Sequence, residues 1–159
     1  MEDQPKRKPM RMKEYDYAQA GAYHVTICTK DHACVLSRIV GEGLCALPEV
    51  SLTSIGRCVE ESIRFLSAEW DAITVEGYVI MPNHVHLLIR IDRTGGRGGP
   101  PLHEVIRRLK SYTTYRYGRT LWQRSYYDHI IRGQQDYDET LQYIQNNPLR
   151  WVMRQREEV

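Results

Sequence analysis

Apolar and polar residues alternate along Ala22–Thr29, with Tyr23, Val25 and Ile27 on one face and His24, Thr26 and Cys28 on the other. A period of two is typical of a half-buried β-strand. The same reasoning predicts strands over Ala72–Ile80 and His84–Ile91, joined at Met81-Pro82-Asn83, a last strand over Ser125–Ile131, and a short strand near Leu36–Val40.

Three other segments have the 3.6-residue period of amphipathic helices. The first follows Leu52 and carries an apolar stripe of Ile55, Val59, Ile63 and Leu66, with Ser51 or Thr53 as its N-cap. The second has Leu102, Val105, Ile106, Leu109 and Tyr112 on one side. The third covers Asp136–Asn147, and we expect Pro148 to end it, because a residue before proline disfavours the α region.

The order strand, helix, strand, strand, helix, strand, helix predicts an α+β fold of the ferredoxin-like, split βαβ kind. Such a fold has an antiparallel sheet with helices on one face, which leaves the opposite face as a working surface. A chain of 159 residues is long enough for one domain. Residues 1–14, with five basic and three acidic side chains and two prolines, are predicted to form a flexible basic arm, and residues 15–159 the domain.

Composition narrows the class of protein further. No apolar run approaches the length of a membrane-spanning helix, and the charged N-terminus has no apolar stretch typical of a secretion signal. The four cysteines form no CxxC pair, which argues against a zinc clip and is typical of a reducing compartment. We therefore expect a cytoplasmic protein.

Charge is distributed unevenly along the chain, although 22 basic and 20 acidic residues leave a net charge of only +2. Residues 41–76 hold seven acidic and two basic side chains, a net −5, whereas residues 101–127 hold six basic and one acidic, a net +5. Tyrosines and Trp122 lie among these basic residues. Cations neutralise phosphates and aromatic rings stack on unpaired bases, so this segment is a candidate DNA surface. The alternative interpretation is a solvated helix face with its aromatic rings in the core.

The strongest candidate for chemistry is His84-Val85-His86 in an otherwise apolar strand. Residues two apart on a strand share a face, so both imidazoles can bind one divalent metal or a phosphate. In the last helix, Tyr143 and Asn147 belong to a polar stripe separate from the packing stripe of Tyr137, Leu141 and Ile144. That stripe, which also includes Asp136 and Thr140, either presents a phenol and an amide together or is an ordinary helix rim.

Two other segments carry weaker signals. Trp122–Arg132 holds aromatic rings, a carboxylate, an imidazole and two arginines. Asp128 and His129 are adjacent on the predicted strand and face opposite ways, so they do not form a hydrolase dyad. The Gly-rich segment at 93–101 lacks the GK[ST] ending of a phosphate-binding loop and is predicted to be a flexible connector.

Together these residues resemble the single-tyrosine transposases with a His-apolar-His (HUH) motif, and most closely the REP-associated tyrosine transposases. The resemblance rests on MPNHVHLLI around His84 and His86, on WQRSYYDHIIR, and on YIQNNP from Tyr143, and it covers about residues 15–151. It implies a metal-dependent enzyme in which Tyr143 is the nucleophile. His84, His86 and Asn147 are then the ligands of Mg²⁺ or Mn²⁺.

The resemblance also implies a substrate: single-stranded or hairpin DNA, cleaved and rejoined through a 5′-phosphotyrosine. DNA contacts are expected from Arg107, Arg108, Lys110, Tyr115, Arg116, Arg124, Tyr127 and Arg132. The sequence leaves two alternative functions open: a replication initiator or relaxase of the same chemistry, and a catalytically silent nucleic-acid-binding module. It also leaves open whether the protein is a monomer or a homodimer in which the Tyr143 helix of one subunit serves the histidines of the other.

Overall fold

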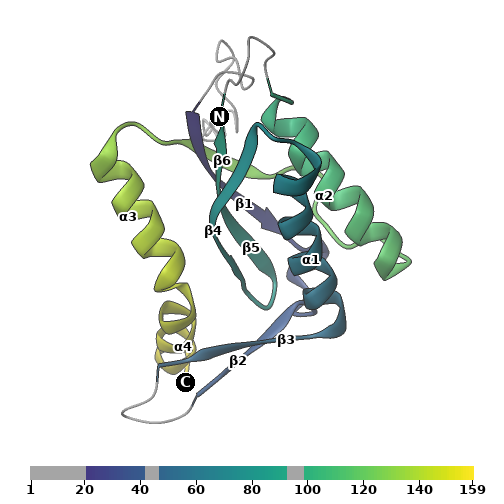
Figure 1. Cartoon of the computed structure of the whole chain (residues 1–159). Helices are drawn as coiled ribbons and strands as arrows, with labels where there is room; N and C mark the ends of the chain where they lie inside the picture. Colours follow the sequence, from purple (N-terminus) through teal and green to yellow (C-terminus); the bar gives the residue numbers. More distant parts are fainter. Residues whose placement is uncertain (1–20, 42–46, 93–98) are drawn as a thin grey trace, which may run out of the picture.

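A four-stranded antiparallel sheet forms the centre of the computed structural model, which describes residues 21–41, 47–92 and 99–159. The strands are β1 (Gly21–Cys28), β4 (Ile73–Ile80), β5 (His84–Ile91) and β6 (Tyr127–Ile130), in the order β4-β5-β1-β6. Each neighbouring pair is antiparallel. This sheet with its helices confirms the predicted α+β fold (Figure 1).

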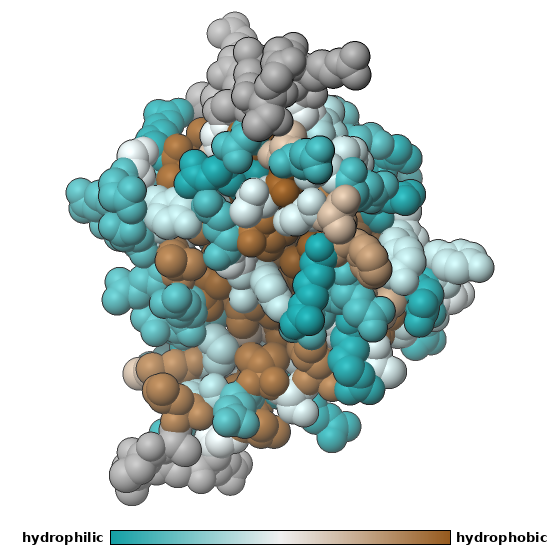
Figure 2. Space-filling view, viewed as in Figure 1, coloured by the Kyte–Doolittle hydropathy of each residue, from teal (hydrophilic) through white to brown (hydrophobic). Residues whose placement is uncertain are grey.

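Helices lie on both faces of the sheet. On one side are α1 (Ser54–Glu69) and α2 (Leu102–Tyr117), and on the other are α3 (Gln134–Gln145) and α4 (Asn147–Glu157) (Figure 1). The face opposite α1 and α2, which the sequence predicts to be a free working surface, is therefore partly covered by α3. In Figure 2 hydrophilic side chains dominate the two outer layers, and hydrophobic ones lie between them.

Alternation along the strands divides the buried side chains into two clusters. Inward residues such as Val25, Val85 and Leu87 pack with the apolar stripes of α1 and α2 in the larger cluster. The smaller cluster, on the other face, joins Ala22 and Leu88 to Ile144 of α3. Tyr137 and Leu141 pack against it, so the predicted packing stripe of the last helix is confirmed.

The start of α1 is held against the loop before β2 (Ser37–Val40), which pairs with β3 (Glu49–Leu52) in a separate hairpin. Of the two predicted N-cap candidates, Thr53 is the N-cap, and its Oγ1 accepts a hydrogen bond from the Gly56 N–H at 3.1 Å. A Cβ at Gly56 would lie 1.9 Å from the Leu36 carbonyl oxygen. Glycine at this position is therefore required for the close approach of helix and loop.

The expected end of the chain's last helix at Pro148 is only half right. The helix breaks slightly earlier than expected: α3 spans Gln134–Gln145 instead of Asp136–Asn147, and Asn146 lies between the two helices. A new helix, α4, then begins with Pro148 in its first turn. Proline is tolerated in a first turn because its missing N–H has no partner within the helix there.

Some predicted features lie outside the described residues: the basic arm at 1–14, Cys45, and residues 93–98 of the Gly-rich segment. Among the helices that the structure describes, none combines the length and the apolarity needed to cross a membrane.

Candidate active site

The sheet face that carries α3 also carries a group of histidines. His84 and His86 lie on β5 with their rings 4.8 Å apart between centroids. Thr26 of β1 is the register partner of His86, and Cys28 is the partner of His84. Because antiparallel partners project to the same face, β1 and β5 together form the base of the site. This arrangement brings the two predicted histidines together.

The neighbouring loop residue Asn83 orients His84. Asn83 Oδ1 lies 2.7 Å from His84 Nδ1. An amide oxygen only accepts hydrogen bonds, so Nδ1 carries the proton and donates it, and the lone pair is on Nε2. The sequence analysis missed this role, although Asn83 directly precedes the motif.

Two β1 side chains orient His86. His86 Nδ1 lies 2.9 Å from Thr26 Oγ1 and 3.1 Å from His24 Nε2. Nδ1 is thus occupied by contacts to β1, and Nε2 is the nitrogen turned away from them. His24 is a third imidazole at the site that the sequence analysis did not select. Its alternation with Thr26 and Cys28 is visible in the sequence, but the position of β1 beside β5 is not.

Helix α3 brings Tyr143 over these rings. The Tyr143 ring contacts His86 edge-on with centroids 5.3 Å apart, and it contacts His24 at 5.8 Å. Asn147, one turn later, is buried, and its Nδ2 donates a hydrogen bond to the Tyr143 carbonyl oxygen at 3.4 Å. The Asn147 side chain also interacts with the His84 ring and opposes the lowering of its pKa by burial. The structure therefore gathers all four residues that the resemblance selects: His84, His86, Tyr143 and Asn147.

Burial keeps the imidazoles of the site neutral. It lowers the pKa of His86 to about 3, with the charges of His84 and His24 acting in the same direction. Burial also lowers the pKa of His24 to about 4, helped by His129 and opposed by Asp136. The pKa of His84 is lowered as well, mainly by burial. A neutral imidazole has a lone pair, so at neutral pH these rings are in the form that binds metals.

The donor set suits a divalent cation. The His84 Nε2 lone pair, the outer nitrogen of His86 and the Asn147 amide oxygen come from separate elements that meet here. Each histidine has its other nitrogen held by a protein group, as is usual for metal-binding histidines. Within the described residues no group of three His, Cys, Asp or Glu side chains is arranged to hold a metal. Beside the two imidazoles, the buried Asn147 amide would be the third donor for such a cation.

Helix α4 adds two residues that were missed from the sequence because no helix was expected after Pro148. The Arg150 guanidinium carbon lies 4.8 Å from the centroid of the Tyr143 ring. The Trp151 ring lies 6.2 Å from that of His84. Both residues border the site from the side of α4.

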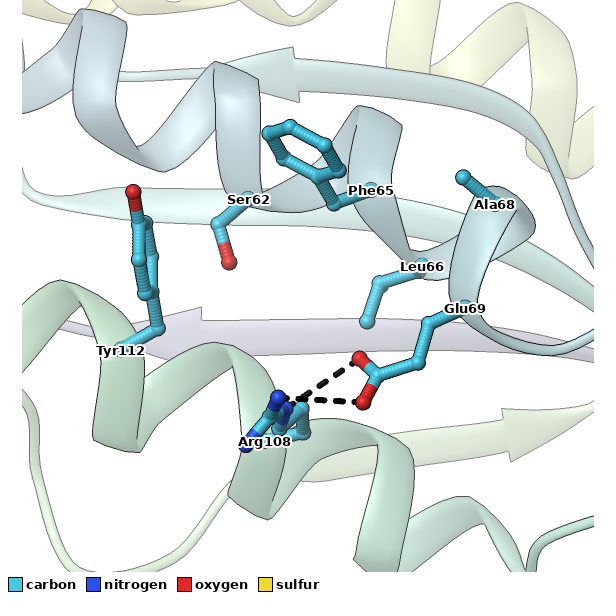
Figure 3. Close-up of a pocket in the computed structure, with 7 residues that line it drawn as sticks. All are labelled: Ser62, Phe65, Leu66, Ala68, Glu69, Arg108 and Tyr112. Carbon is cyan, nitrogen blue, oxygen red and sulfur yellow. Dashed lines mark hydrogen bonds and ion pairs between the residues drawn. The ribbon is translucent and has the colours of Figure 1, made fainter.

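The basic residues of α2 lie on the opposite face of the sheet from the histidines. Arg107 pairs with Glu104 on the same helix, and Arg108 pairs with Glu69 of α1 at 3.1 Å. The latter pair crosses a groove of about 410 Å³ between the two helices (Figure 3). Lys110 Nζ donates to the carbonyl oxygens of Gln123, Arg124 and Ser125 at 2.8–3.3 Å. Three of the predicted DNA contacts thus also bind groups of the protein itself.

The remaining predicted DNA contacts are distributed over both faces. Tyr115 and Arg116 near the end of α2 are exposed, as is Arg124. Tyr127, an exposed residue of β6, pairs with Thr26 and so lies on the histidine face. Arg132, also exposed, follows β6 where the chain turns toward α3. Its backbone N–H donates a hydrogen bond to the Asp136 carboxylate.

His129 and Asp136 link β6 to the start of α3. His129 Nε2 lies 2.9 Å from an Asp136 carboxylate oxygen. Asp128 projects to the other face of β6, as expected, so it forms no dyad with His129. Asp136 of the predicted polar stripe thus helps to hold the start of α3 against β6, and Thr140 of the same stripe is buried.

The chain resembles known proteins in sequence as well as in fold. The sequence model of the family described as "Transposase IS200 like" matches residues 18–147. An uncharacterized protein of Haemophilus influenzae is 29% identical over 167 residues, which is 91% of this chain and 89% of that protein.

Two solved structures share the fold. The first is a REP-associated tyrosine transposase bound to a REP hairpin. It matches with a TM-score of 0.66 and 18% identity over 88% of this chain and 73% of that one. The second is a putative transposase from Deinococcus radiodurans, with a TM-score of 0.50 and 18% identity over 86% of this chain and 95% of that one.

The low pKa of His24 predicts a pH-dependent stability. The folded protein binds a proton at His24 only near pH 4, whereas the unfolded chain binds it near pH 6.5, so stability decreases as the pH falls from about 6.5 toward 4. Between pH 7 and 5 this amounts to about 2 kcal/mol. Between pH 7 and pH 5, the free energy of unfolding of the wild type should therefore fall by about 2 kcal/mol more than that of His24→Gln. Denaturant titrations at the two pH values measure this difference. His103→Gln, a change at an exposed histidine of α2, is the control. Equal losses for wild type and His24→Gln would contradict the assignment.

Proposed function

The chain belongs to the IS200-like transposase family, and we propose that it cleaves and rejoins single-stranded or hairpin DNA with Tyr143 as the nucleophile. The observation that carries this proposal is the placement of Tyr143, whose ring packs against His86 5.3 Å away between centroids. A phenol beside a buried pair of neutral imidazoles combines a nucleophile with ligands for a cation. Nothing in ordinary core packing requires these groups to meet.

The reaction is a transesterification. Tyr143 Oη loses its proton and attacks the phosphorus of a phosphodiester, forming an O–P bond while the bond from phosphorus to the 3′ oxygen breaks. The leaving 3′ oxygen takes up a proton, which yields a 5′-phosphotyrosine and a free 3′-OH. Attack by another 3′-OH on this phosphotyrosine reverses the step and rejoins DNA. The number of phosphoester bonds is unchanged, so no ATP is consumed.

His84, His86 and the Asn147 amide oxygen would hold the divalent cation, Mg²⁺ or Mn²⁺. A cation bound there supplies Lewis-acid polarisation of a phosphate oxygen. The protein's own contribution is orientation: Asn83 holds the His84 ring, Thr26 and His24 hold that of His86, and the Asn147 amide is held against the Tyr143 carbonyl. Burial lowers the pKa values of these imidazoles, so the rings are unprotonated at neutral pH.

Single-stranded DNA suits the surroundings of the site. The strand must be unpaired for its phosphate to reach a half-buried phenol, and exposed aromatic rings such as Tyr127 and Tyr115 offer stacking surfaces. The transposase of similar fold is bound to a REP hairpin, and we extend a hairpin substrate to this chain on that basis. Tyr127 lies on the same face of the sheet as His86 and Tyr143, whereas Tyr115 lies on α2 across the sheet. Tyr127 is therefore the nearer stacking surface.

Substitution of the nucleophile tests the function directly. We expect Tyr143→Phe to abolish the covalent protein–DNA adduct and to leave DNA binding nearly intact, because the ring still packs and only the attacking oxygen is lost. The measurement is a denaturing gel of protein mixed with single-stranded hairpin DNA and Mn²⁺. Tyr126→Phe and Tyr127→Phe are the matched controls. An adduct that survives in Tyr143→Phe and disappears in a control would assign the nucleophile to another tyrosine. Binding without any wild-type adduct would favour a silent DNA-binding module.

The ligand assignment predicts loss of metal binding. Removal of either imidazole in His84→Ala or His86→Ala should abolish calorimetric Mn²⁺ binding and cleavage, and EDTA should stop cleavage by the wild type. Folding should survive, because both rings lie outside the large core cluster. Exposed His103→Ala is the control. Cleavage that persists in EDTA would exclude the metal role, and insoluble protein from both variants would indicate a structural role.

Helix α2 is proposed as a second DNA surface, on the face away from Tyr143. Its exposed ion pairs are worth about 0–1 kcal/mol each, so phosphates can replace the carboxylates. For Arg107→Gln and Arg116→Gln we expect weaker binding to all sequences and a salt slope shallower by about 0.7–0.9 per residue. Lys110→Met should instead lower the melting temperature, since Lys110 holds three carbonyl oxygens. Affinity at several salt concentrations, measured with melting temperature, separates these effects. If the salt dependence of DNA affinity is the same in these variants as in the wild type, α2 does not contact DNA.

A further inference from the structure

Arg150 on α4 lies beside the proposed nucleophile, Tyr143, and the proposed transesterification gives it no role. We propose that Arg150 binds the phosphate group that Tyr143 attacks. This inference rests on the proposed function and adds to it a residue that contacts the reacting phosphodiester. It assigns α4, beyond the break at Pro148, to the substrate site.

The position of Arg150 is the first argument. Its guanidinium carbon lies 4.8 Å from the centroid of the Tyr143 ring, so the cation and the phenol are neighbours although they belong to different helices. The next residue, Trp151, has its ring 6.2 Å from that of His84. The beginning of α4 therefore approaches both the proposed nucleophile and one proposed metal ligand. A phosphate that Tyr143 can attack must lie within this group of side chains.

The state of the guanidinium is the second argument. Arg150 is exposed, and among the described residues no carboxylate lies within ion-pair distance of it. Other arginines do have a carboxylate partner, such as Arg90 with Glu76 and Arg108 with Glu69. A guanidinium next to a nucleophile, with no protein anion beside it, is available for an anionic ligand.

The chemistry of the guanidinium is the third argument. Arginine is charged at every relevant pH, and its planar fork of donors matches two oxygens of a phosphate. As Tyr143 Oη bonds to phosphorus and the 3′ oxygen departs, negative charge accumulates on the non-bridging oxygens. Hydrogen bonds from Arg150 to these oxygens would strengthen at that moment, which lowers the barrier rather than merely improving binding.

A purely structural role makes a different prediction. If Arg150 only supports the Tyr143 ring by a cation–π contact, its loss would affect the enzyme in the same way whatever the charge of the phosphate. If it binds the phosphate, its loss matters only when that phosphate is negatively charged. A methylphosphonate, in which one non-bridging oxygen is replaced by a methyl group, removes the charge and distinguishes the two roles.

The experiment compares wild type, Arg150→Gln and Arg150→Lys, with Arg156→Gln as the matched control. Arg156 is an exposed arginine of the same helix, and no ring contact places it near Tyr143 in the part of the chain that the structure describes. The cleavage site is first mapped with wild-type protein. Adduct formation is then timed on an oligonucleotide with either a normal linkage or a methylphosphonate at that site.

On the normal linkage we expect Arg150→Gln to slow adduct formation about 100-fold. Arg150→Lys should be intermediate, because a lysine keeps the charge without the fork, and Arg156→Gln should match wild type. On the methylphosphonate the rates of wild type and Arg150→Gln should converge. An equal defect on both linkages, or none on the normal one, would overturn the inference.

A binding measurement keeps the test decisive if the methylphosphonate reacts too slowly to time. In the Tyr143→Phe background, replacing the charged linkage by the methylphosphonate should weaken DNA binding, and the loss should be clearly smaller when Arg150→Gln is added. A loss that is the same with and without Arg150 would overturn the inference. Wild-type protein that forms no adduct with any tested hairpin would instead overturn the proposed function, so the two failures are distinguishable.

Discussion

Thr26 lies directly opposite His86 in the β1–β5 pair, and the arrangement of the whole site depends on this register. A shift by one residue would turn every side chain of one strand to the other face. His84 and His86 would then enter the large core, and Val85 and Leu87 would leave it. The cost of exposing these apolar side chains holds the register in place. The same hydrophobic packing that stabilises the fold thus keeps the imidazoles on the α3 face.

The break between α3 and α4 is the second determinant of the site. An uninterrupted helix would continue in one direction past Asn147. Instead Pro148 cannot donate the next hydrogen bond, and the chain starts a new helix. Asn147, buried at this junction, reaches both the Tyr143 carbonyl and His84. The first turn of α4 then lies near the rings of the site, with Arg150 over Tyr143 and Trp151 beside His84. The missing N–H of Pro148 therefore helps to position both the Asn147 amide and the Arg150 guanidinium.

The two faces of the sheet serve different purposes. The α1–α2 face contains most of the buried apolar surface, and its outer side is rich in arginine. The α3 face buries fewer residues and carries the imidazoles. The opposite charges of the 41–76 and 101–127 segments meet in the Arg108–Glu69 pair between α1 and α2 (Figure 3). Such exposed pairs contribute little to stability.

The sequence by itself determined everything that depends on local period. The alternation of β5 put His84 and His86 on one face, and the helical period separated Tyr143 from Tyr137, Leu141 and Ile144. Only the tertiary structure decided what depends on distant parts of the chain. His24 became a neighbour of His86 because β1 inserts between β5 and β6, and the basic helix α2 came to lie on the far face from Tyr143. Strand order and the side on which a helix packs are set by the burial of apolar area across the whole fold, which no window of neighbouring residues contains.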